Sequence, residues 1–168
     1  VVQQADADRK WNIHILQRMA DIDMQRLDWK QAIRVYEQIR TLRPDDEGVR
    51  KNLIDLSLKM GQPAQANAEI ENYLTYLQTN NSSEQGIKFV QELLGDRPND
   101  VVLRRALAQL YQQAGRVEDA VAQLDSLAES LLGAGKKEEA MVVINQILLI
   151  GPRNADQYRQ LLIQLQSG

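Results

Sequence analysis

The sequence predicts an all-α fold, a solenoid of about nine stacked antiparallel helices that form one domain over residues 1–168. Apolar residues recur at intervals of three and four, and no stretch alternates apolar and polar residues for long enough to predict a strand. Three prolines, Pro44, Pro98 and Pro152, stand 54 residues apart (98 − 44 and 152 − 98). A fixed period of this length is typical of a repeat architecture.

Residues that interrupt helices divide the chain into helices of ordinary length. Each of the three periodic prolines ends a helix, because the residue before a proline avoids the α region. Asp46, Asp100 and Asn154 follow these prolines and can cap the next helix by accepting a hydrogen bond from a free backbone N–H. The predicted helices span residues 8–25, 29–42, 46–60, 63–79, 84–95, 100–114, 117–132, 136–149 and 154–166.

The remaining breaks lie at residues that favour turns. Gly61 and Gly115 can end helices in a conformation with positive φ, and Asn81 and Gly135 have the same role one helix further on. All of these links are short, so sequential helices must pack against each other in antiparallel fashion.

The composition excludes several classes of protein. The 168 residues carry a net charge of −3 and give a pI near 5.2, so we expect no nucleic-acid partner, since such a partner usually requires a basic face. No cysteine is present, which excludes disulfides and fits a cytoplasmic location. No apolar run approaches about 18 residues, so we expect no membrane span. The chain begins without methionine, and we expect it to be a piece of a longer protein.

Two segments resemble phosphate-binding and calcium-binding loops, but neither has the residues that such loops require at fixed positions. A phosphate-binding loop at residues 133–137 would need glycine where Ser130 stands, and a calcium loop beginning at Asp21 would need glycine where Arg26 stands. His14 is the only histidine, and no cluster of metal-ligating residues accompanies it. We therefore expect no enzyme activity, no metal and no cofactor.

Two overlapping sets of residues repeat one pattern, in which a leucine, a small residue, a glycine and an alanine follow at fixed steps. The sets are Leu107, Ala108, Tyr111, Gly115, Ala120, Leu124 and Leu127, and then Leu124, Leu127, Ala128, Leu131, Gly135, Ala140, Ile144, Ile147 and Pro152. Their spacing resembles the tetratricopeptide repeat, a helix-turn-helix unit of about 34 residues.

The two sets share the helix at 117–132, so the repeating unit is a triplet of helices with a 54-residue period. The triplets span residues 1–44, 45–98 and 99–152, and residues 153–168 begin a partial one. Arg50 and Arg104 stand where the family pattern has tryptophan early in its first helix, and only Tyr158 approximates it.

The resemblance implies a non-enzymatic module for protein–protein interaction, a scaffold that presents a curved helical surface to a protein or peptide partner. Leu53, Leu107 and Leu161 stand 54 residues apart and form a column, and in the family basic residues two places before this leucine face the concave groove. The residues that this comparison selects for a groove holding an extended or helical acidic segment are Lys51, Arg105, Gln109, Gln112 and Arg159. The alternative is a solvated basic stripe that only keeps the helices soluble.

A second function, self-association, is suggested by the apolar last helix. No further helix follows to cover Tyr158, Leu161, Leu162 and Leu165. We expect this end to pack on a second copy, on helix 8–25, or on repeats of a longer chain. Trp11 and Trp29 are predicted to pack between helices near the amino end, and the alternative for each is an exposed anchor for a partner.

Overall fold

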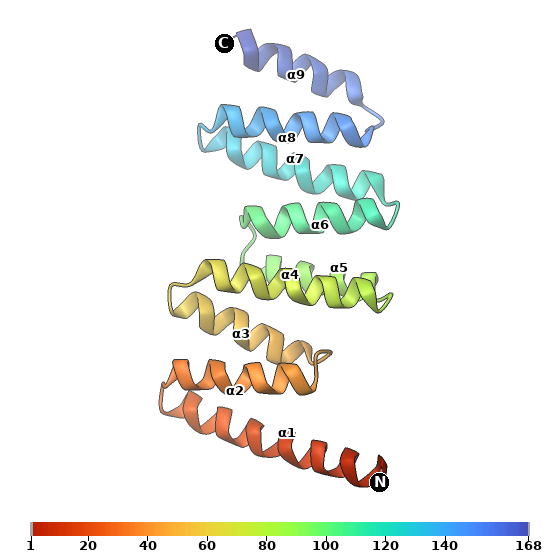
Figure 1. Cartoon of the computed structure of the whole chain (residues 1–168). Helices are drawn as coiled ribbons and strands as arrows, with labels where there is room; N and C mark the ends of the chain where they lie inside the picture. The colour runs from red at the N-terminus through yellow and green to blue at the C-terminus, as the bar shows by residue number, and fades with distance from the viewer. Residues whose placement is uncertain (1, 168) are drawn as a thin grey trace. The chain divides into compact units, whose positions relative to one another are not determined.

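The computed structural model describes residues 2–167, and all of the secondary structure in this range is α-helical (Figure 1). The helices are α1 (Val2–Gln25), α2 (Trp29–Leu42), α3 (Glu47–Lys59), α4 (Pro63–Thr79), α5 (Ser83–Asp96), α6 (Val101–Gln113), α7 (Val117–Gly133), α8 (Lys137–Ile150) and α9 (Ala155–Ser167). They fall into two compact units, unit 1 (Val1–Asn81) and unit 2 (Ser82–Gly168). A single domain over the whole chain stays a prediction.

The predicted all-α fold and its helices are confirmed. Eight helices begin and end within one residue of the expected positions, and α1 begins at Val2 rather than at residue 8. The 54-residue step is present in the backbone itself: α2, α5 and α8 are each 14 residues long, and α3, α6 and α9 are each 13. The repeating unit is therefore a helix triplet.

Two of the predicted caps form as expected. The carboxylate of Asp46 accepts a hydrogen bond from the Val49 backbone N–H at 3.1 Å, and that of Asp100 accepts one from Leu103 at 3.1 Å. Asn154 makes a different contact, because its side-chain amide donates to Gln157 Oε1 at 3.0 Å. The two aspartate bonds satisfy backbone donors that the first turn of a helix leaves free.

Positive φ angles at the helix ends also recur with the period. Gly61 and Gly115 have φ values of 69° and 72°, as the sequence predicts. Leu27, Asn81 and Gly135 form a second column 54 residues apart, with φ values of 58°, 56° and 74°. The same backbone turn is thus built once from leucine, which has no intrinsic preference for this region.

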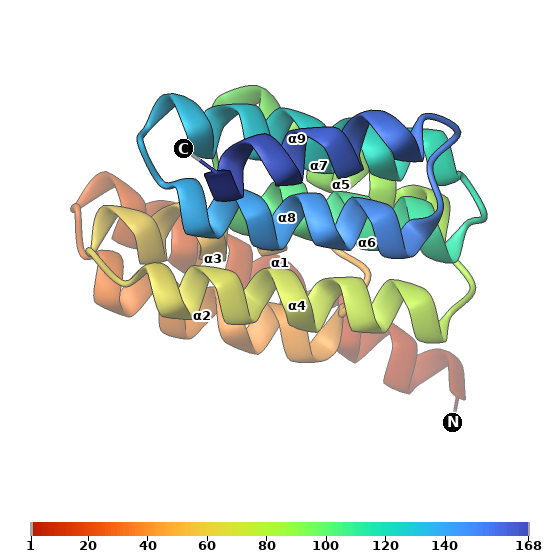
Figure 2. The ribbon, with the colours of Figure 1, turned by 90° about the horizontal axis from the view of Figure 1, so that it is seen from above.

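In unit 1, α1 and α3 lie on one side and α2 and α4 on the other, each packed on its neighbour in sequence (Figure 2). One core cluster of α1 to α3 contains Ile13, Ala20, Ala32, Val35, Tyr36, Ile39, Val49, Leu53 and Leu56. Ala20, Ala32 and Ala66 are fully buried, which lets the helix axes approach closely.

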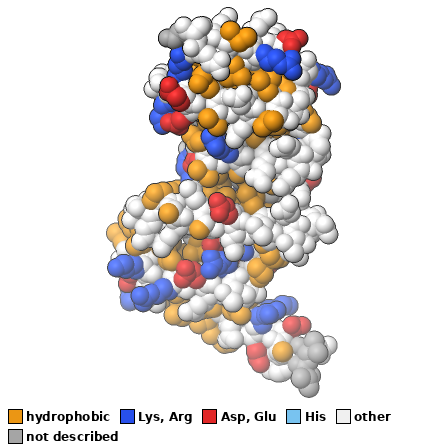
Figure 3. Space-filling view, turned by 45° about the horizontal axis from the view of Figure 1, so that its top comes forward, with side chains coloured by type: hydrophobic (Ala, Val, Ile, Leu, Met, Phe, Trp, Pro, Cys, Tyr) orange, Lys and Arg blue, Asp and Glu red, His pale blue; other side chains and the backbone are white. Residues whose placement is uncertain are grey.

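In unit 2, α5, α7 and α9 lie on one side and α6 and α8 on the other (Figure 2). A core cluster of this unit contains Ala108, Val121, Leu124, Leu127, Ala128, Leu131, Ala140, Val143, Ile144, Ile147, Tyr158 and Leu162. Within residues 2–167, no helix has both the length and the apolar character that crossing a bilayer requires. On the face drawn in Figure 3, Lys and Arg are interspersed with Asp and Glu rather than gathered in one basic patch.

Candidate functional site

A groove of about 480 Å³ opens on unit 2. Residues of α6 and α8, which lie on the same side of unit 2, form its walls, and α7 of the other side contributes one residue (Figure 2). The lining residues are Arg105, Ala108, Gln109 and Gln112 of α6, Leu124 of α7, and Gln146, Leu149 and Ile150 of α8.

The polar wall of the groove follows from the helical spacing of α6. Arg105, Gln109 and Gln112 stand at positions i, i+4 and i+7, so they share one face of the helix. Leu103 and Leu107 are buried on another face and hold α6 in the core. The polar row is exposed because the apolar stripe of the same helix fixes its rotation.

Arg105 is the only charged residue that lines this groove, and no carboxylate accompanies it. Within residues 2–167 its guanidinium takes part in no hydrogen bond or ion pair. An unpaired guanidinium in a groove without acids gives this site a positive potential.

The opposite wall adds the apolar side chains of Leu149 and Ile150 beside Gln146. Leu149 is 87% exposed, although the core stripe of α8 is already complete with Val143, Ile144 and Ile147. The three glutamines around it can each donate and accept hydrogen bonds. The groove therefore combines a cation, amides suited to a peptide backbone and an apolar contact for a side chain.

The structure brings together three of the five predicted groove residues, Arg105, Gln109 and Gln112. Arg159 lies on α9 and pairs with Asp156 at 2.5 Å. A triplet contains an odd number of helices, so α6 and α9 fall on opposite sides of unit 2 and Arg159 does not join the groove (Figure 2). Lys51 belongs to unit 1, where it pairs with Glu47 at 2.9 Å.

Sequence reasoning missed the contribution of α8 to the groove, which consists of Gln146, Leu149 and Ile150. One signal was available. The run from Ile147 to Ile150 is apolar at four successive positions, and a helix with one buried stripe cannot bury them all.

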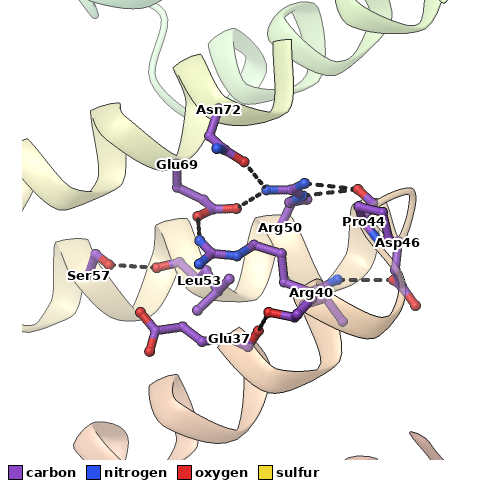
Figure 4. Close-up of polar contacts among 11 residues, drawn as sticks. Glu37, Arg40, Pro44, Asp46, Arg50, Leu53, Ser57, Glu69 and Asn72 are labelled. Carbon is purple, nitrogen blue, oxygen red and sulfur yellow. Dashed lines mark hydrogen bonds and ion pairs between the residues drawn. The ribbon is translucent and has the colours of Figure 1, made fainter. Parts of the chain in front are cut away.

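Unit 1 holds a buried polar network around Arg50, which is 2% exposed (Figure 4). Arg50 Nη2 and Nε donate to the carbonyl oxygen of Pro44 at 2.9 and 3.2 Å. Arg50 Nη1 donates to Glu69 Oε1 at 2.6 Å and to Asn72 Oδ1 at 2.7 Å. Glu69 also pairs with Arg40, so two arginines flank one buried carboxylate.

The corresponding arginine of unit 2 makes the same backbone contact. Arg104 Nε donates to the carbonyl oxygen of Pro98 at 2.9 Å, and its Nη1 donates to Gln123 Oε1 at 3.3 Å. Arginine at the family's tryptophan position therefore satisfies the carbonyl of a periodic proline and reaches the next helix. This role is structural, because the polar groups involved are already partnered.

The other hollows of unit 1 offer less definite chemistry. One of them, about 650 Å³, is lined by residues of both charges, among them Asp6, Arg9, Lys10, Arg43 and Asp45. Among the residues that the structure describes, no group of three or more His, Asp and Glu side chains could hold a metal ion.

The apolar residues of α9 largely cover the core of their own unit. Tyr158 and Leu162 are buried, and Leu161 and Leu165 pack against the same core as partly buried residues. The Tyr158 hydroxyl donates to Asp125 Oδ1 at 3.0 Å, and burial together with this carboxylate raises the pKa of Tyr158 to about 12. Self-association through this helix stays a prediction.

A comparison with protein families finds the repeat that the sequence resembles. The family model described as tetratricopeptide repeat matches residues 77–130, and no curated protein matches the chain. Among solved structures, a thermophilic TPR protein of Thermus thermophilus is 16% identical, covers 93% of this chain and 100% of its own, and has a TM-score of 0.34. YrrB, described as a TPR protein with an unusual peptide-binding site, is 12% identical. The match covers 94% of this chain and 97% of YrrB, with a TM-score of 0.36. PilF of Pseudomonas aeruginosa is 14% identical. The match covers 96% of this chain and 95% of PilF, with a TM-score of 0.36.

The matched segment includes α5, α6 and most of α7, so it contains the first wall of the groove. It contains the first of the two repeat sets, among them Leu107, Ala108, Tyr111, Gly115 and Ala120. Residues 77–130 are thus similar to the tetratricopeptide repeat.

Proposed function

We propose that this protein is a non-enzymatic interaction module whose groove in unit 2 binds an acidic peptide segment that carries an apolar side chain. Tetratricopeptide repeats are scaffolds for protein–protein interaction, and the chemistry of this groove supports a peptide ligand. The observation that carries the proposal is Arg105, an unpaired guanidinium in a groove whose other polar lining residues are glutamines.

The dimensions of the groove agree with a short segment. The seven-residue step from Arg105 to Gln112 corresponds to about 10 Å along α6. An extended peptide covers this length with about three residues. A carboxylate of the ligand would pair with Arg105, the glutamines would bond to its backbone, and Leu149 would contact its apolar side chain.

The proposal is tested with a fluorescein-labelled peptide library in which acidic residues alternate with leucine. Fluorescence anisotropy should detect binding to the wild-type chain, and Arg105→Glu should weaken it by about tenfold or more, because a charge pair becomes a repulsion. Arg159→Glu is the matched control, since it makes the same charge reversal on α9, outside the groove.

Binding that persists unchanged in Arg105→Glu would contradict the proposal, and so would an equal loss in both variants. Leu149→Ser should weaken binding without changing its dependence on salt, because this substitution removes an apolar contact and no charge. A Leu149→Ser variant with full affinity would remove the apolar contact from the proposal.

Self-association through α9 is the other function that the sequence suggests. Ile163 is the one large apolar residue of α9 that is strongly exposed, at 63%. If this helix mediates self-association, Ile163→Asp should convert an oligomer to a monomer, as measured by light scattering. The groove is the better-supported site, because most apolar residues of α9 are already used within unit 2.

A further inference from the structure

Helix α1 carries apolar residues on two faces. Ile13 and Ala20 are buried on the face that packs against α2. On another face Trp11 is 64% exposed, and Ile15, Met19 and Ile22 are 41%, 42% and 47% exposed. These four residues, named here the α1 stripe, follow steps of four, four and three, so they form one continuous row. A helix that is apolar on two faces is typical of an element buried between two neighbours.

The 54-residue step indicates what the stripe normally contacts. The α1 residues Ile15 and Met19 correspond to Glu69 and Tyr73 of α4, 54 residues later. In α4 these two residues face the preceding helix: Glu69 pairs with Arg50 of α3, and the Arg50 guanidinium lies 5.1 Å from the centre of the Tyr73 ring. The stripe thus stands where the repeat places a preceding helix.

Unit 2 repeats this arrangement independently. The α7 counterparts of Ile15 and Met19 are Gln123 and Leu127, 108 residues later (2 × 54). Gln123 accepts a hydrogen bond from Arg104 of the preceding helix α6, and Leu127 is buried. The stripe of α1 is the exposed form of a helix-packing surface that both later triplets use.

We propose that the α1 stripe pairs with the α1 stripe of a second copy of this chain, in an antiparallel arrangement with two-fold symmetry. Charge complementarity selects this occupant, because Asp8 of α1 and Arg26 stand at opposite ends of the stripe; Arg26 directly follows α1, and its backbone N–H still donates to the Ile22 carbonyl oxygen. If Ile15 of one copy meets Met19 of the other, Trp11 meets Ile22 and Asp8 meets Arg26. A parallel pairing would instead place Asp8 against Asp8.

The charges at both ends are available for this contact. Within residues 2–167, the Arg26 side chain makes no hydrogen bond or ion pair, and Asp8 makes only a long contact, accepting from Gln4 Nε2 at 3.4 Å. Each of the two Asp8–Arg26 pairs would form at the rim of the apolar seam, where such pairs contribute more to orientation than to affinity.

A second copy could also offer α9, which occupies the same place in its triplet as α3 and α6. Its outer face does not fit the stripe. Gln157 and Gln164 of α9 are exposed at the positions where α6 has the buried residues Leu103 and Leu110. Packing α9 on the stripe would bury these two amides against apolar side chains, which is costly without hydrogen-bond partners.

The seam is small. Four apolar side chains per copy, with their charged flanks, are less than the about 800 Å² per partner of a standard interface, so we expect a dissociation constant in the micromolar range. Sedimentation velocity of the full chain from about 1 to 200 μM should detect a monomer–dimer equilibrium. Ile15→Asp should raise the dissociation constant by about tenfold or more, because it places a carboxylate in the seam.

The matched control is Ile163→Asp, which makes the same change at an exposed isoleucine of α9 and should leave the dimer intact. Asp8→Arg should weaken the dimer, and the double variant Asp8→Arg with Arg26→Asp should restore it. Because the chain has no cysteine, a mixture of Trp11→Cys and Ile22→Cys chains should form the mixed disulfide in preference to either homodimer. Circular dichroism checks that every variant stays helical.

A monomer over the whole concentration range would overturn the proposal and leave the stripe to a helix from elsewhere. A dimer that Ile163→Asp abolishes and Ile15→Asp does not would overturn it in favour of α9. Preferential self-crosslinking of Trp11→Cys would contradict the antiparallel arrangement. None of these outcomes depends on the peptide groove, which lies in unit 2.

Discussion

The substitution Glu69→Ala should strongly destabilise unit 1. Glu69 is 7% exposed and lies between Arg40 and Arg50. Its removal leaves the Arg50 guanidinium buried with Asn72 and the Pro44 carbonyl as its remaining hydrogen-bond partners, and neither group carries a countercharge. The variant therefore retains a buried, uncompensated positive charge.

The magnitude follows from the burial of the two arginines. The side chain of Arg50 is 3% exposed, so loss of its partner should cost about 3–5 kcal/mol of the free energy of unfolding, the range for breaking a buried ion pair. The side chain of Arg40 is 31% exposed and can be solvated when its partner is removed, so it adds little.

The assay is urea denaturation followed by tryptophan fluorescence. Both tryptophans, Trp11 and Trp29, lie in unit 1, so this signal reports on unit 1. Glu71→Ala is the matched control: it removes the same charge from the same helix at an exposed position, and it should change the free energy of unfolding by no more than about 0.5 kcal/mol.

A Glu69→Ala cost equal to that of Glu71→Ala would refute this reasoning. The double variant Arg50→Met with Glu69→Leu provides a further check. It replaces the buried charges by apolar groups of similar size and should recover most of the lost stability. Failure to recover would mean that the contacts of Arg50 with Pro44 and Asn72, rather than its charge, set the cost.

Two further predictions concern turns and pH. Leu27 has a φ of 58° and is 72% exposed. Leu27→Gly should therefore relieve backbone strain and stabilise unit 1 by about 0.5–1 kcal/mol, as measured in the same fluorescence assay. A loss of stability would show that the contacts of the leucine side chain contribute more to stability than its φ angle costs. Burial first, and then Asp125, raises the pKa of Tyr158 from 10.0 to about 12, so its contribution to stability is fully present below about pH 10 and is lost as the pH rises through about 12. Urea denaturation followed by circular dichroism at about pH 9 and about pH 11 should show a smaller loss of stability in Tyr158→Phe than in the wild type, and equal losses would contradict this role for Tyr158.

Most of the fold could be predicted because the residues that begin and end its helices act locally. Asp46 and Asp100 cap their helices through bonds to backbone groups three residues away, and Gly61 adopts positive φ at a helix end. Such signals depend on neighbouring residues only. Leu27 carries no such signal, since its conformation is imposed by the packing of α1 on α2 and not by its own preference.

The candidate site was less predictable, because it depends on which helices lie side by side. Arg105 could be selected from the sequence, but Leu149 could not be assigned to the same groove without knowing that α6 and α8 form adjacent walls. The predicted packing of Trp29 is confirmed, whereas the packing prediction for Trp11 is wrong, because that residue is exposed on α1. An amphipathic pattern predicts that a helix has an apolar face and does not predict whether a neighbour covers it.

The odd number of helices in a triplet has a consequence for how such a chain can evolve. When a segment with an even number of helices is duplicated, every residue returns to the face that it occupied before. Duplication of this triplet moves each residue to the opposite side, as Arg105 of α6 and Arg159 of α9 illustrate within unit 2. The same ancestral residues therefore lie on one side of the stack in one copy and on the other side in the next. Only every second copy has them on the same side, where selection for binding acts in the same way. A binding face in such a protein can diverge without loss of the helix contacts that all copies share.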